Sequence, residues 1–302
     1  METQMLPIDG KEVVNLNEPP FKKMRNEITT MNDNDFIILM PSSTALKTAV
    51  EIMSHTLIDV TFKIDKAEND TVFLRVDAMD SGSICACKVR LKCTGNCSDE
   101  NDFCVKLKPL LEILRPLPGN EGIQLFRKKG KSDVELKTLG CESHHYKLRT
   151  LQDSYYREAL ESCETTYSVD FDLAKLKSHL RVITNLKADT LKIQIFKLLA
   201  TNSLIFKLSC DGLDASAEWN FFSSSNGGAL GFWKQDDSEQ KKVLYDEEYS
   251  TEYLKNFTKS MERSSVTLSF NNDDPKVLVV EYSLGQEDSS IIFLLAPKIS
   301  GD

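Results

Sequence analysis

Five cysteines within twenty positions are the residues with the clearest capacity for chemistry: Cys85, Cys87, Cys93, Cys97 and Cys104. Thiolates are preferred zinc ligands, so Cys93-x3-Cys97 could begin a metal site, although structural zinc sites more often show the tighter Cys-x2-Cys spacing. Cys85 and Cys87 also alternate like residues on one face of a strand, where cysteine acts as a small apolar residue. The spacing therefore favours a buried strand, and a zinc-binding intracellular regulator is kept as an alternative hypothesis.

The chain offers little that resembles a catalytic site. Of its four histidines, His144 and His145 fall in a predicted edge strand, and His179 lies near an apolar helix face. No serine or cysteine stands in a recognisable nucleophile motif with a histidine. The stretch "GGALG" at 227–231 lacks the strand–loop–helix setting that a phosphate-binding loop needs. We therefore predict a protein without enzyme activity, metal or cofactor.

Length and composition indicate a globular protein with two domains. The chain has 302 residues, of which 41% are hydrophobic and 27% charged. The longest apolar run, residues 291–296, is far too short to span a membrane, and we predict no membrane partner. Eight cysteines without a secretory signal are typical of reduced thiols in an intracellular protein. The net charge of −9 argues against nucleic-acid binding by the surface as a whole.

Most of the sequence shows the short, alternating apolar pattern of strands, and only four segments show a helical period. These are residues 44–57, 108–115, 173–186 and 250–261, each followed by a group of strands. Apolar residues recur at i, i+3, i+4 and i+7 in these segments, which is the pattern of a helix lying on a sheet. The sequence therefore predicts a repeated unit of one helix and several strands.

Positive charge is concentrated on the opposite faces of these four segments. Counted over residues 42–58, 105–115, 173–187 and 250–263, the formal charges are 0, +2, +4 and +1. They total +7 in a chain of net charge −9, so the remaining residues carry −16. One basic helix face is usually a solvated surface, but four of them in an acidic chain favour a shared surface for a polyanion.

Several motifs resemble the eukaryotic-type DNA sliding clamp, the proliferating cell nuclear antigen family. The C-terminal block "EYLKNFTKSMERSSVTLSF", "VLVVEY" and "FLLAPKI" stands in the order and spacing of that family, and "DAMDSGSICACKVRL" and "LEILRPLPGNEGIQL" are further matches. The resemblance implies an α+β fold with two helices packed on antiparallel sheets in each of two domains. It divides the chain into an extension at 1–34, domains at 35–151 and 167–302, and a connecting loop at 152–166.

The resemblance also implies a processivity factor whose three chains close into a homotrimeric ring around double-stranded DNA, without reading its sequence. Residues matched to the family on the inner surface are Lys47, Arg115, Arg181 and Lys259; helical geometry adds Lys108, Lys177 and Lys255, and His55 lies on the same face. By analogy, the strand at 203–212 would pair with residues 144–151 of the next subunit, which places Tyr146, Leu148, Leu204 and Phe206 at the interface.

In the family, DNA polymerase and other replication or repair enzymes dock short peptides in an apolar pocket, and a clamp loader is a further candidate partner. The matching positions are Met79, Ile84, Leu160, Val277, Leu294, Ala296 and Pro297. Leu294 stands where the cellular family usually has an aromatic residue, and Val277 where it has proline, so we expect a different client preference. This divergence is closer to that of large DNA virus homologues. We therefore expect the protein at intracellular sites of DNA replication, in the nucleus or, if it is viral, in viral factories in the host cytoplasm.

The leading hypothesis is therefore a ring-forming clamp. The principal alternative keeps the fold but not the ring, as a monomeric DNA-binding processivity subunit held by charge alone. Binding to linear DNA that falls steeply with salt would favour that alternative. Stoichiometric zinc in the purified protein would instead favour the regulator suggested by the cysteine cluster.

Overall fold

The computed structural model describes residues 34–67, 70–98, 101–140, 143–151, 164–199, 203–223, 231–232, 241–259, 265–271, 276–285 and 288–298. Two halves follow one another with nearly the same order of elements. Both the predicted extension at 1–34, apart from its last residue, and most of the predicted connecting loop lie outside these residues.

The first half contains two helices, each placed after a strand. Its elements are β1 (Asn34–Met40), α2 (Thr44–Met53), β2 (Asp59–Lys66), β3 (Thr71–Met79), β4 (Cys85–Cys97), β5 (Asn101–Lys106), α3 (Leu107–Leu114), β6 (Ile123–Lys128), β7 (Val134–Thr138) and β8 (His145–Leu148).

The second half repeats this order with one additional short strand. Its elements are β9 (Tyr167–Asp172), α4 (Leu173–Asn185), β10 (Thr190–Leu198), β11 (Leu204–Asp211), β12 (Ser216–Ser223), β13 (Gly231–Phe232), β14 (Lys241–Ser250), α5 (Thr251–Thr258), β15 (Ser265–Phe270), β16 (Leu278–Ser283) and β17 (Ser290–Leu295).

The strands form two antiparallel sheets. The larger has twelve strands, with the path β8-β7-β6-β1-β4-β17-β16-β15-β9 and β2, β3 and β5 beside it; the smaller has the order β13-β12-β11-β10-β14. Strand β4 joins the two halves because its first residues pair with β17, for example Cys87 with Phe293. The larger sheet therefore runs continuously from the first half into the second.

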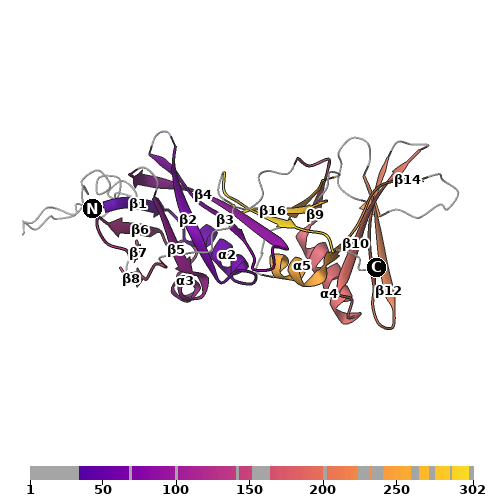
Figure 1. Ribbon diagram of the computed structural model, residues 1–302, viewed down its shortest axis with the longest axis horizontal. Coiled ribbons are helices and arrows are strands. Elements are labelled where there is room, and N and C mark those ends of the chain that lie inside the picture. Colours follow the sequence, from indigo (N-terminus) through magenta and orange to yellow (C-terminus); the bar gives the residue numbers. More distant parts are fainter. Residues whose placement is uncertain are drawn as a thin grey trace, which may run out of the picture.

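All four described helices lie along the lower edge of the molecule in Figure 1, and strands β4, β16 and β9 of the larger sheet lie above them. Their apolar faces, together with the inward faces of the strands, form one buried cluster that extends through both halves. The alternation of buried and half-exposed residues in β3 and β10 is the pattern of strands covered on one face. None of the described helices is long and apolar enough to cross a membrane.

The four predicted helices are confirmed, with differences at their ends. α2 ends at Met53, four residues before the predicted end, because residues 54–56 form a turn in which the N–H of Thr56 donates to the Met53 carbonyl. α4 begins where Asp172 caps it, its carboxylate accepting from the Lys175 N–H at 2.9 Å. α3 stays short because Pro116, just beyond its end, cannot continue the backbone ladder.

Candidate functional site

The four helices form a row that crosses the boundary between the halves. α2 packs against α3, α4 against α5, and α2 also contacts α5. At that crossing the side-chain amide of Asn256 on α5 donates to the carbonyl of His55 at 3.5 Å. The polar faces of helices from both halves therefore form one surface, which we call the helix face.

The predicted DNA-facing residues differ in exposure on the helix face. The side chains of Lys108, Arg115, Arg181 and Lys259 are exposed, and those of His55, Lys177 and Lys255 are half-buried. Lys175 on α4 is also exposed and was missed, although its place between the apolar positions Leu173 and Leu176 could have been read from the sequence. The exposed side chains offer cations from α3, α4 and the end of α5.

His55 lies where three of the helices approach one another. Burial lowers the pKa of His55, the charge of Lys259 lowers it further, and Arg115 adds to the effect while Glu51 opposes it. Arg115 follows α3 and Lys259 follows α5, so cations from two halves of the chain act on one imidazole. The structure therefore brings His55, Arg115 and Lys259 together, as a shared polyanion surface requires.

Lys47 has a different environment from the other predicted cations. Its ammonium group donates to the Arg115 carbonyl at 2.7 Å and to the Leu117 carbonyl at 3.4 Å. These carbonyls belong to the end of α3, where a cation stabilises unpaired backbone acceptors. Lys47 thus links α2 to α3, and its charge is partly used within the protein.

Three of the seven residues predicted for the peptide pocket, Met79, Val277 and Leu294, belong to a small apolar cluster on the sheet face opposite the helices. We call it the junction cluster: Met79, Ala86, Val277, Val279, Ile292 and Leu294. Its members come from β3, β4, β16 and β17, and from the residue before β16. Neighbouring residues such as Cys87 and Phe293 point to the main core instead, which places the cluster on the outer face.

The members of the junction cluster are unequally accessible. Val277 and Leu294 are 2% and 5% exposed, whereas the adjacent Ile84 is 42% exposed and Met79, Ala296 and Pro297 are half-buried. A ligand would therefore reach the cluster at its rim. Ala86, Val279 and Ile292 were missed by sequence reasoning, although the alternation in "CACKV" and "VLVVEY" contains the signal. Leu160 lies outside the described residues.

The segment after β17 continues the ladder at this rim. The Ala296 N–H donates to the Ile84 carbonyl at 2.9 Å, which is the next rung beyond the β4–β17 pairs. Two residues later, the Lys298 N–H donates to the Glu248 carbonyl of β14 at 2.7 Å. Pro297 between them has no N–H to donate. The segment 296–298 thus crosses from the larger sheet to the smaller one.

The predicted pairing of residues 203–212 across a subunit boundary is wrong. These residues form β11, which already pairs with β10 on one side and β12 on the other. Phe206 is 3% exposed and packs against Phe171 and Phe270 in the core, and Leu204 is half-buried on the same strand. A strand with both edges hydrogen-bonded cannot accept a third strand.

The other predicted interface strand does lie at an edge. β8 is the last strand of the larger sheet; Tyr146 on it is half-buried and Leu148 is buried beneath it. Among the described residues of the smaller sheet, the corresponding open edge belongs to β12, because β13 pairs only with Phe221 and Phe222. The prediction took 203–212 by analogy with the clamp family, and the strand that the structure leaves open is the next one along the chain.

The cysteine cluster lies in the core. Cys85, Cys87 and Cys93 are buried strand residues; burial raises the pKa of the Cys85 and Cys87 thiols, and raises that of Cys93 to about 12. Within the described part of the chain, no three His, Cys, Asp or Glu side chains are grouped as a metal site. Neutral, buried thiols are poor zinc ligands, which counts against the regulator hypothesis.

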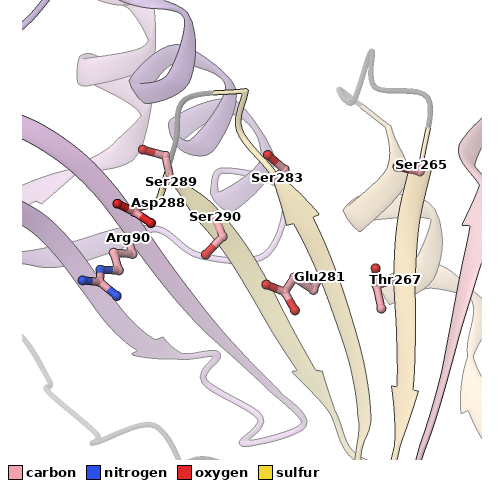
Figure 2. A pocket seen from close by; sticks show the side chains of 8 residues that line it. All are labelled: Arg90, Ser265, Thr267, Glu281, Ser283, Asp288, Ser289 and Ser290. Atoms are coloured by element: carbon pink, nitrogen blue, oxygen red, sulfur yellow. The ribbon is translucent and has the colours of Figure 1, made fainter.

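A polar depression of about 440 Å³ lies elsewhere on the outer sheet face (Figure 2). Hydroxyl and charged side chains line it: Arg90, Ser265, Thr267, Glu281, Ser283, Asp288, Ser289 and Ser290. Two of these side chains already bind residues outside the depression: Asp288 pairs with Lys92 at 2.9 Å, and Thr267 donates a hydrogen bond to Asp170 at 2.7 Å. We assign no ligand to it.

The two helices on antiparallel strands in each half, and the sheet shared between the halves, define the α+β fold of the DNA sliding clamps. A crystal structure of proliferating cellular nuclear antigen from Entamoeba histolytica matches with a TM-score of 0.70 and 17% identity, over 88% of this chain and 100% of that chain. A crystal structure of a PCNA2–PCNA3 complex from Sulfolobus tokodaii matches with a TM-score of 0.67 and 15% identity, over 87% and 99%.

At these identities the likeness establishes the clamp fold. No family model and no curated protein matches the chain. These two structures come from an amoeba and an archaeon, and they give no support to a viral origin.

Proposed function

We propose that this protein is a DNA polymerase processivity factor, a sliding clamp that encircles duplex DNA and tethers replication and repair enzymes. The observation that carries the proposal is the helix face: four helices on one side of the sheets, with exposed cations from both halves, in a chain of net charge −9. Such a surface favours the phosphate backbone over base edges, so contact with DNA would be independent of sequence.

Two open strand edges support closure into a ring of identical chains. In β7 and β8 the Thr138 N–H donates to the His144 carbonyl, and alternation along the ladder then directs the backbone groups of His145 and Lys147 outward. In β12 the Gly212 N–H donates to the Ala215 carbonyl. The same alternation along that ladder directs the backbone groups of Ser216, Glu218 and Asn220 outward. Edge strands at opposite ends of a chain suit head-to-tail pairing.

The junction between β4 and β17 provides a model for that pairing. There a strand of one half joins the last strand of the other half in antiparallel register. β12 and β8 hold the corresponding places in the order of the two halves, and both lack a full partner in the described residues. We therefore place β12 of one subunit beside β8 of the next. We propose that three identical chains close the ring, as the resemblance to the sliding clamps implies.

The solution mass tests the ring. Three chains of 34.1 kDa give about 102 kDa, which light scattering across a dilution series should detect. Retention on circular DNA should then be lost when the DNA is linearised, because topology rather than affinity holds a ring. A persistent monomer that binds linear DNA, with affinity falling steeply with salt, would contradict the ring. It would support the alternative of a monomeric processivity subunit held on DNA by charge alone.

A further inference from the structure

Asp80 organises the turn between β3 and β4. Its side chain is 6% exposed, and its Oδ1 accepts from the backbone N–H groups of both Ile84 and Cys85 at 2.8 Å. The Asp80 N–H donates to the Cys85 carbonyl at 2.9 Å, and the Ser83 N–H donates to the Asp80 carbonyl at 3.0 Å. Ser83 has a φ of 56°, a conformation that needs such support in a non-glycine residue.

The second carboxylate oxygen of Asp80 binds a distant helix. Its Oδ2 accepts from the Tyr253 hydroxyl of α5 at 2.5 Å, between residues 173 positions apart. Burial raises the pKa of Tyr253, and the bond to Asp80 raises it further, so the hydroxyl keeps its proton and donates. A hydrogen bond to a carboxylate is shorter and stronger than one between neutral groups.

The turn held by Asp80 borders the rim of the junction cluster. Ile84 is the most exposed apolar residue there. Its N–H donates to the Asp80 carboxylate, and its carbonyl accepts from the Ala296 N–H. The Asp80 carboxylate therefore binds Ile84 directly and is connected to Ala296 through Ile84. Loss of the bond to Tyr253 would free the turn that fixes Ile84, and with it the rung to Ala296.

α5 supports the same region by a second contact. Phe257, one turn after Tyr253, stacks on Phe293 with ring centroids 4.1 Å apart and an angle of 10° between the planes. Phe293 precedes Leu294 of the junction cluster and pairs with Cys87 of β4. The helix that carries Lys255 and Lys259 on the helix face therefore holds the cluster from beneath, through Phe293, and at its rim, through Asp80.

We propose that Asp80 and Tyr253 are positioning residues of the partner-docking site: their hydrogen bond holds the 80–84 turn in the form that receives a client peptide. The inference rests on the proposed function, because it assumes that clients dock at the junction cluster. The occupant is a short client peptide with apolar side chains, because the rim offers the exposed Ile84 beside the extended segment 296–298.

The test compares two tyrosine-to-phenylalanine variants. Tyr253→Phe removes the hydroxyl that binds Asp80 and leaves the ring that lies 6.2 Å from Phe257. Tyr282→Phe is the matched control, because the buried Tyr282 hydroxyl has no hydrogen-bond partner among the described residues. Both variants should keep the solution mass of the wild-type protein.

Two readouts separate a positioning role from a general loss of stability. The first is hydrogen exchange at the amides of Ile84, Cys85 and Ala296, which should be about tenfold faster in Tyr253→Phe, as expected for loss of a bond to a charged group. The second is fluorescence anisotropy with a library of labelled 12-residue peptides that carry aliphatic and aromatic side chains at varied spacings. The Kd of peptides that bind the wild type should rise about tenfold in Tyr253→Phe. Tyr282→Phe should change neither readout.

The outcomes distinguish the inference from the function on which it rests. Unchanged exchange in Tyr253→Phe, or unchanged peptide affinity with a binding wild type, overturns the positioning role and leaves docking intact. A wild-type protein that binds none of the peptides overturns docking at the junction cluster itself. An equal loss of affinity in Tyr282→Phe would show that any change in the core has this effect, which also overturns the inference.

Discussion

The two halves of the chain have nearly the same order of elements, but the corresponding strands β4 and β12 differ in length and in pairing. In the first half, β4 is 13 residues long and pairs with β1 near its end and β17 near its start. In the second half the corresponding strand, β12, has 8 residues and pairs with β11 and the two-residue β13. Strand β4 therefore belongs to a sheet of twelve strands drawn from both halves, whereas β12 belongs to a sheet of five.

This difference shows how a repeated unit can produce one closed and one open junction. A long β4 reaches both neighbours, so that its edge is used within the chain. A short β12 retains outward N–H and C=O groups, which is costly for a monomer because open edges invite other strands. The open edge is explained if another copy of the chain supplies the missing strand.

The largest expected effect comes from blocking the opposite open edge, on β8. Lys147→Pro removes an N–H that points outward, so the ladder to β7 should survive while pairing between chains is lost. Light scattering should show the mass falling from about 102 kDa to 34.1 kDa.

Lys147→Ala is the control for that variant. It loses the same ion pair to Asp133, 2.9 Å long in the wild type, but keeps the N–H. It should remain a trimer at the same concentration. A trimeric Lys147→Pro protein would show that β8 is not the pairing edge, and the comparison of the two junctions would fail.

The second prediction concerns the face shared by both halves. Replacing Arg115, Arg181 and Lys259 by alanine removes exposed cations from the helix face. If each meets a phosphate, the slope of log K against log salt should become less steep by about 0.9 per cation, and polymerase stimulation on long templates should fall. Binding to linear DNA at several salt concentrations measures the slope.

The matched control removes the same charge from the outer face. Lys63, Lys88 and Arg90 lie on strands β2 and β4, and each alternates with buried residues that face the helices. The triple alanine variant should bind DNA like the wild type. Equal losses in the two triple variants would mean that net charge, rather than the helix face, determines binding.

The sequence predicted the helices well and the strand edges poorly, for a physical reason. A helix face is encoded locally, at i, i+3, i+4 and i+7, so Leu176, Leu180 and Ile183 identify α4 without knowledge of the sheets. Whether a strand is at an edge depends on pairing between distant residues. β11 and β12 both alternate, and only the ladders show that β11 is enclosed.

The same contrast applies to the candidate sites. Met79, Val277 and Leu294 could be assigned to one cluster because the resemblance supplied their spatial relation, and the structure brings them together. The role of Lys47 could not be predicted, since its hydrogen bonds go to carbonyls 68 and 70 residues away. The bond between Asp80 and Tyr253 joins the two halves and has no local signature either.

A third prediction tests the register that lets β4 close the first half. Gly95 pairs with Ile38, and a Cβ at Gly95 would lie 2.1 Å from the Ile37 carbonyl oxygen. Gly95→Ala should therefore push β4 from β1 and lower the free energy of unfolding by about 1–3 kcal/mol. Urea denaturation measures this change.

Gly130→Ala separates crowding from backbone strain. Gly130 has a φ of +72° with nothing within 4 Å of an added Cβ, so its cost should come from the backbone alone, about 1–2 kcal/mol. Thiol labelling should then show faster exposure of Cys97, which pairs with Phe36, only in the Gly95 variant. Equal protection of Cys97 in both variants would contradict the proposed strain at the β1–β4 pairing.

The smallest expected effect is a dependence of stability on pH that both halves share. Burial lowers the pKa of His55 at the end of α2 and of His179 on α4, with Lys259 and Arg115 acting on the first and Lys175 on the second. Each histidine then binds a proton less readily in the folded state than in the unfolded state. The free energy of unfolding should therefore decrease as the pH falls below about 6.5, the unfolded pKa of histidine.

The two sites should respond differently once DNA is present, which distinguishes the halves. His55 lies among Arg115 and Lys259 on the helix face, so bound phosphates would offset those cations and favour its protonation. His179 packs against Trp219 and Phe221, and burial and Lys175 lower its pKa. Urea denaturation at pH 7.5 and 5.5 should show a smaller pH dependence in His55→Gln and in His179→Gln than in the wild type. Added duplex DNA should reduce the acid destabilisation of the wild type more than that of His55→Gln, because Lys259 and Arg115 both act on His55 whereas Lys175 acts on His179.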